Sequence, residues 1–275
     1  MSRIKTVFSQ LKSQNKAALI PFITAGDPDA DTTVALMHQL TQSGVDLIEL
    51  GVPFSDPMAD GPTIQRASER ALKHHISLQD VFTMVAQFRK TNQATPVVLM
   101  GYANPVEAMG YKKFVEGASE AGVDGVLIVD YPPEESAEWV QSLEEKAIDP
   151  IFLLSPTTSE ARIKHVAELA KGYVYYVSLK GVTGASHLDL QDVSDKLSQL
   201  RAHINIPIGV GFGIRDEQTA RDVAERADAV VIGSYIVEEI ERSSAEDLLA
   251  NVGARVASLR RAIDTKSNHA SGKGE

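Results

Sequence analysis

The chain has 275 residues, 43% of them hydrophobic, which suits two small domains or one large (β/α)8 barrel, a fold that typically takes about 250 residues. It contains no cysteine, which excludes disulfide bonds and thiolate chemistry, and it has no apolar run near the ~18 residues that span a bilayer. Its formal net charge of −10 repels phosphodiester backbones, so we expect no nucleic-acid partner.

Residues 1–16 alternate charged and apolar side chains without an uninterrupted hydrophobic stretch. We therefore predict no secretory signal and a cytoplasmic location. Ile4, Val7, Phe8 and Leu11 recur at helical spacing in this segment, which predicts an N-terminal helix. Eight short apolar runs follow, at residues 18–24, 46–50, 96–101, 125–129, 150–154, 173–177, 207–210 and 229–232.

Most of these runs are continuous rather than alternating, as expected for parallel strands buried on both faces. Helical stripes between them indicate βαβ units, and eight such units favour a closed α/β TIM barrel over a doubly wound sheet. We expect one domain over residues 1–265 and a polar, disordered tail at 266–275. Extra helices are expected after the second strand, near 63–74 and 78–90, and after the eighth.

Two acidic residues stand close together after the second predicted strand. Glu49 lies within that strand, and Asp60 follows eleven residues later in a loop rich in glycine and proline. Isolated acids in such places are most often surface or turn residues. Here, however, Glu49 is flanked by Ile48 and Leu50 in a strand expected to be buried, and burial raises the pKa of a carboxyl group towards neutrality. This pattern predicts acid–base chemistry on a small molecule.

Three glycine-rich turns follow the late strands, at 181–184, 211–213 and 233–234. Barrels typically hold phosphate in the loops after strands seven and eight and at the start of a short extra helix, here from Ser234. This favours a phosphate site built from backbone N–H groups over plain turns. Residues at the strand ends that would line the pocket, or simply form barrel core, are Phe22, Met100, Tyr102, Leu127, Val129, Leu153, Tyr175, Phe212 and Ile232.

Other catalytic schemes have little support in the sequence. The seven histidines form no ligand pair in register with an acid, so no catalytic metal is expected. There is no G-x-S-x-G motif, and Lys180 is the only lysine near a strand end that would suit a Schiff base.

Several stretches of the chain resemble the tryptophan synthase alpha chain family between residues 21 and 237. They read PFITAGDPD, DLIELGVPFSDPMADGPTIQRAS, MGYANPV, GVLIVDYPPEE, GVTGA, VGFGI and VIGSYIV, and the second is the most specific. The resemblance implies a lyase that splits indole-3-glycerol phosphate into indole and glyceraldehyde 3-phosphate by a retro-aldol reaction, with no cofactor in this chain. It also implies a beta chain carrying pyridoxal phosphate, joined in an alpha2-beta2 heterotetramer, which receives the indole and activates the alpha chain allosterically.

The resemblance also implies roles for individual residues. Glu49 would take the proton of the glycerol hydroxyl and protonate indole C3, and Asp60 would accept a hydrogen bond from the indole N–H. Leu179 stands where the family often has a basic residue, which puts an ionic contact there in doubt. The beta chain would dock on residues 53–58, 104–105 and 132–133. The indole and glycerol would contact Phe22, Tyr102, Leu127, Tyr175, Thr183, Phe212 and Ile232, and the phosphate would bind Gly184, Gly213, Gly233 and Ser234.

Two other functions are compatible with the same residues. An isomerase or epimerase acting on a phosphorylated sugar would also use a phosphate site and two carboxylates. A catalytically silent barrel that only activates a partner is the third possibility.

Overall fold

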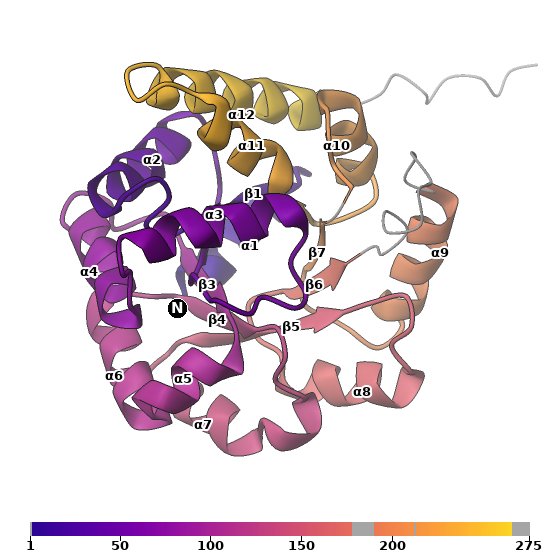
Figure 1. Ribbon diagram of the computed structural model, residues 1–275. Helices are drawn as coiled ribbons and strands as arrows, with labels where there is room; N and C mark the ends of the chain where they lie inside the picture. Colours follow the sequence, from indigo (N-terminus) through magenta and orange to yellow (C-terminus); the bar gives the residue numbers. More distant parts are fainter. Residues whose placement is uncertain (1, 178–189, 212, 266–275) are drawn as a thin grey trace, which may run out of the picture.

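The computed structural model describes residues 2–177, 190–211 and 213–265. Within them eight parallel strands close into a barrel in chain order, with β8 paired to β1 (Figure 1). The predicted (β/α)8 barrel is confirmed. The strands are β1 (Ala18–Thr24), β2 (Ile48–Gly51), β3 (Val97–Gly101), β4 (Gly125–Ile128), β5 (Asp149–Leu154), β6 (Val174–Val177), β7 (Ile208–Gly211) and β8 (Ala229–Ile232).

The helices of the described part surround the barrel, and two follow β2 and two follow β8, as predicted. Within these residues no helix is long and apolar enough to cross a membrane. The helices are α1 (Arg3–Ser13), α2 (Ala30–Gln42), α3 (Pro62–Lys73), α4 (Leu78–Arg89), α5 (Ala103–Met109), α6 (Tyr111–Ala121), η1 (Pro133–Glu135), α7 (Ala137–Glu145), α8 (Glu160–Leu169), α9 (Leu190–Arg201), α10 (Glu217–Ala224), α11 (Ser234–Arg242) and α12 (Leu248–Asp264).

Asn104 and Pro105, which the resemblance assigns to the docking surface, lie in the first turn of α5. Proline is tolerated there because the first N–H groups of a helix have no intrahelical acceptor. Gly110, at φ +87°, then separates α5 from α6.

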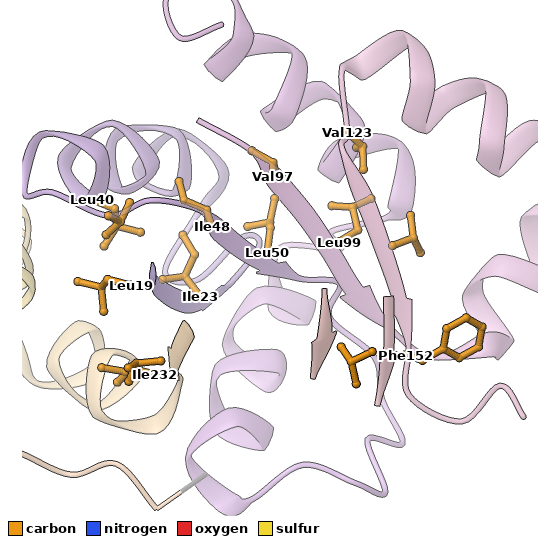
Figure 2. Packing of buried hydrophobic residues seen from close by; sticks show 14 of the residues in the cluster. Leu19, Ile23, Leu40, Ile48, Leu50, Val97, Leu99, Val123, Phe152 and Ile232 are labelled. Atoms are coloured by element: carbon orange, nitrogen blue, oxygen red, sulfur yellow. The ribbon is translucent and has the colours of Figure 1, made fainter. Parts of the chain in front are cut away.

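Alternation along the strands divides the hydrophobic residues into two layers. Leu19, Ile23, Ile48 and Leu50 face the helices in one large cluster (Figure 2). A second cluster fills the barrel and includes Leu47, so that both faces of each strand are buried. This explains why the strands read as continuous apolar runs. Side chains of α1 join the inner cluster, which confirms the predicted N-terminal helix: Ile4, Phe8 and Leu11.

Aspartates brace the start of several strands. Asp46, Asp124 and Asp228 each accept a hydrogen bond from the first N–H groups of a neighbouring strand, at 2.8–2.9 Å. Asp124 is also paired with both Arg3 and Arg89. These bonds satisfy backbone donors at the N-terminal end of the barrel, which leaves the opposite end open for the loops that follow the strands.

Candidate active site

Glu49 lies inside the barrel because it alternates along β2 with Ile48 and Leu50, which face the helices. Its side chain is only 1% exposed. The Tyr173 hydroxyl donates a hydrogen bond to Oε1, while Oε2 is buried with no hydrogen-bond partner among the described residues. Burial raises the pKa of Glu49 to about 7, although the bond from Tyr173 opposes this rise. Glu49 is therefore poised to exchange a proton near neutral pH.

Asp60 lies in the loop between β2 and α3 and is half-buried. Burial raises its pKa to about 6, and a hydrogen bond with the Tyr102 hydroxyl opposes the rise. That hydroxyl also accepts a bond from the Ala59 N–H at 3.1 Å. The Gln65 side chain donates to the Asp60 carbonyl at 2.8 Å, so the loop is held from both sides. Both Asp60 and Glu49 therefore titrate closer to neutral pH than an exposed carboxyl group does.

Tyr175 shows that the two acids face the same region. It is buried on the inner face of β6, and its pKa is raised first by burial and then by the charges of both Glu49 and Asp60. Because such effects weaken with distance, both carboxylates lie near the Tyr175 phenol. The phenol occupies space left by Gly211, where an added Cβ would lie 2.2 Å from the Tyr175 oxygen.

Phe22 lies next to Glu49, because the two residues are partners in the pairing of β1 with β2. Its ring fills the space above Gly51, where an added Cβ would lie 2.4 Å from the ring carbon Cζ. It packs against Ala67 of α3 and Val237 of α11. The side chains next to Glu49 are therefore apolar and aromatic, as the binding of a flat aromatic ligand requires.

The predicted phosphate end lies at the start of α11. No side chain in the described part of the molecule caps this helix, so its first N–H groups remain available to an anion. Gly233 precedes the helix, and Ser234 begins it and is exposed. Gly213, after β7, is also exposed and has φ +78°, a conformation that favours glycine.

The structure brings together only part of the predicted set. Leu127 lies in the inner cluster, as expected. Ile232 does not face the barrel interior: it belongs to the helix-facing cluster with Leu19 (Figure 2), because β8 turns its neighbour Val231 inward instead. The other predicted contacts lie outside the described residues: Thr183, Gly184 and Phe212, together with Leu179 and Lys180.

Two polar side chains of this region were missed by sequence analysis. Tyr173 bonds to Glu49, and its position two residues before Tyr175, within the predicted strand at 173–177, was a usable signal. Thr24, two residues after Phe22, has a buried hydroxyl without a hydrogen-bond partner in the part of the chain that the structure describes. Among all the residues that the structure describes, no group of three or more histidine, aspartate or glutamate side chains could hold a metal ion.

A groove of about 810 Å³ lies beside the acids rather than over them, between the β2–α3 loop and the outer face of α3. Phe54 and Met58 line it, and Met58 is 77% exposed. Together Phe54 and Met58 give the groove an apolar part next to exposed polar residues, which favours a contact surface.

Comparison with known proteins gives a consistent result. Residues 8–265 match the family model described as tryptophan synthase alpha chain. A tryptophan synthase alpha chain from Nitrosomonas europaea is 82% identical over 98% of both chains, and one from Nitrosospira multiformis is 67% identical over 97% of this chain and 96% of the relative. The crystal structure of tryptophan synthase subunit alpha from Legionella pneumophila str. Paris has a TM-score of 0.90 at 48% identity, covering 96% of this chain and 99% of that one. The chain therefore belongs to the tryptophan synthase alpha chain family.

Proposed function

We propose that this chain is a carbon–carbon lyase of tryptophan biosynthesis that cleaves indole-3-glycerol phosphate to indole and glyceraldehyde 3-phosphate, with Glu49 as its acid–base catalyst. Family membership supplies the reaction. The observation that carries the residue assignment is the buried Glu49 carboxyl group, which has one oxygen without a partner among the described residues and lies beside Tyr175. Such a group is a desolvated proton carrier.

The proton balance can be closed with Glu49 alone. Protonated Glu49 donates its proton to indole C3, which converts the ring into a cationic indolenine. The carboxylate then accepts the proton of the glycerol hydroxyl next to the ring. The electrons of that O–H bond form the aldehyde, the C–C bond breaks, and its electrons return to the ring as indole. Glu49 ends protonated, and no cofactor is required in this chain.

Asp60 supports the cationic intermediate. An ionised Asp60 accepts a hydrogen bond from the indole N–H, which strengthens as the ring becomes positive. A bond that is stronger in the transition state than in the ground state lowers the barrier. The Tyr102 hydroxyl and the Ala59 N–H hold the loop in place for this contact.

The remaining contacts follow the shape of the pocket. Phe22, Leu127 and Tyr175 bound the indole, and Val231 takes the part that sequence analysis gave to Ile232. The phosphate binds backbone N–H groups, which hold an anion despite the negative charge of the chain. These groups belong to Gly213, Gly233 and Ser234, with Gly184 proposed from the resemblance. The resemblance assigns Thr183 and Phe212 to the indole and glycerol instead.

We further propose that a beta chain carrying pyridoxal phosphate docks on this end of the barrel in an alpha2-beta2 tetramer and takes up the indole. The exposed Met58, with Phe54 in the adjoining groove, supports this surface. Docking there would close the site around the loop that carries Asp60, so the beta chain is expected to raise the lyase rate.

An indole-release assay tests the proposal. Glu49→Gln removes the proton but keeps the shape, and general acid–base catalysis is worth about 10²–10⁴-fold, so turnover should fall by at least about 10²-fold. Glu120→Gln on the exposed face of α6 is the matched control and should keep wild-type turnover.

The same assay separates the alternatives. A sugar-phosphate isomerase would release no indole from indole-3-glycerol phosphate. A silent activating subunit would release none either, and its Glu49→Gln variant would still activate the beta chain as well as wild type does.

A further inference from the structure

Two helices lie side by side over the barrel mouth and carry the two ends of the proposed site. α3 begins at Pro62, two residues after Asp60, and α11 begins at Ser234, in the proposed phosphate site. The two helices contact each other (Figure 1). Their separation therefore sets the distance between the indole end and the phosphate end.

The inner faces of the two helices meet over an apolar residue of the pocket. Ala67 and Ile64 of α3 and Val237 of α11 all pack on Phe22. Alanine and valine are small, so this contact allows close approach, but apolar packing has little directionality. The Thr63 hydroxyl also donates a hydrogen bond to Glu238 of α11, but at 3.4 Å it is long. These contacts alone therefore do not fix one helix relative to the other.

The outer faces are joined by a directional ionic clamp. Glu241 of α11 accepts two hydrogen bonds from Arg66, both 2.7 Å long, and one from Arg70 at 2.8 Å. Arg70 uses its other nitrogens to bind both oxygens of Asp27 at 2.7 and 2.8 Å. Planar guanidinium groups bound through two nitrogens fix orientation as well as distance.

This clamp differs from an ordinary surface ion pair, which contributes little. It is a network of four charges, and it ends on Asp27, a buried residue of the β1–α2 loop. The hydrogen bonds and charges of Arg66 and Arg70 lower the pKa of Glu241 to about 2, so Glu241 stays ionised at neutral pH. The clamp thus connects α11 through α3 to the barrel itself.

We propose that Glu241 is a positioning residue, which fixes the spacing between the Asp60 end and the Ser234 end of the site. This rests on the proposed function. A substrate that spans the site can contact both ends at once only when the distance between the two ends matches its own length. Indole alone or phosphate alone touches one end, and its affinity does not depend on that separation.

The test compares Glu241→Gln with a matched variant of the same helix, Glu239→Gln. Glu239 pairs with Arg255 of α12, so its loss weakens the hold on α11 without touching α3. The measurements are KM and kcat for indole-3-glycerol phosphate, and the dissociation constants of indole and of inorganic phosphate. Glu241→Gln should raise KM roughly tenfold, since small misplacements cost up to about 10²-fold. Its two dissociation constants should stay within about twofold of wild type, and Glu239→Gln should change none of these values.

A second variant guards against misfolding. Arg66→Ala removes two of the three bonds to Glu241 from an exposed position, so the fold is kept, and KM should rise by a smaller factor. A wild-type KM in both variants overturns the proposal. Equal weakening of the spanning substrate, indole and phosphate also overturns it, because that is the result of general loosening. A wild-type chain that releases no indole refutes the proposed function itself, and the clamp's role with it.

Discussion

The buried Glu49 should make the stability of the protein depend on pH in a specific way. Its pKa is 4.5 when unperturbed and about 7 in the folded chain, because burial disfavours the charged form. The folded state therefore binds this proton more tightly than the unfolded state does. Below about pH 4.5 Glu49 is protonated in both the folded and the unfolded state, so it does not lower the free energy of unfolding. As the pH rises through 7, the folded state must hold a buried charge, and the free energy of unfolding is lower than at acidic pH.

The size of the effect follows from the shift. The difference between 7 and 4.5 is 2.5 units. At about 1.36 kcal/mol per unit this is about 3 kcal/mol of lost stability above pH 8, an order-of-magnitude figure. Glu49→Gln removes the charge while its amide oxygen still accepts the Tyr173 hydroxyl. The variant should therefore be more stable than wild type by about 3 kcal/mol at high pH.

Urea unfolding of both proteins between pH 4 and pH 9 measures this directly. The difference in unfolding free energy should be near zero at pH 4 and grow between pH 5 and 8. Glu120→Gln, which removes an exposed charge on α6, should show no such growth. A difference between Glu49→Gln and wild type that is the same at every pH would refute the reasoning, because it would not report a titrating carboxyl group.

Three further predictions concern the site. Tyr173→Phe removes a hydrogen bond to the Glu49 carboxylate that is worth about 1.5–3 kcal/mol, so the pKa of Glu49 should rise. The alkaline limb of the kcat/KM profile, where Glu49 loses its proton, should then move up by about 1–2 pH units. A limb that does not move argues against this role of Tyr173. Gly211→Ala places a methyl group 2.2 Å from the Tyr175 oxygen and should lower kcat/KM by up to about 10²-fold with folding intact; wild-type kinetics would mean that Tyr175 moves freely. Met58→Asp charges the proposed docking loop and should weaken beta-chain binding about tenfold or more in a titration; an unchanged dissociation constant removes Met58 from the interface.

The sequence alone was enough to predict Glu49 as the acid–base residue. Glu49 stands in a run that is otherwise apolar, and that is enough to predict a desolvated carboxyl group with a raised pKa. The partner that limits this rise, Tyr173, is 124 residues away in the chain. The sequence did not single out Tyr173, because a tyrosine in a predicted strand is equally compatible with a residue of the hydrophobic core.

The orientation of Ile232 shows a second limit. Both Val231 and Ile232 are apolar and buried, so composition does not tell which of them faces the pocket. The choice depends on the register of β8 against β1, where Pro21 pairs with Ile232. A shift of one residue exchanges the two faces of a strand.

The sequence by itself determined the alternation of strands and helices, the closed barrel and the burial of Glu49, because these depend on patterns repeated within short segments. The tertiary structure alone decided which side chains meet: Tyr173 with Glu49, Tyr175 with Gly211, and Glu241 with Arg66 and Arg70. Contacts of this kind join residues far apart in the chain, and strand register and helix packing fix them only when the barrel closes.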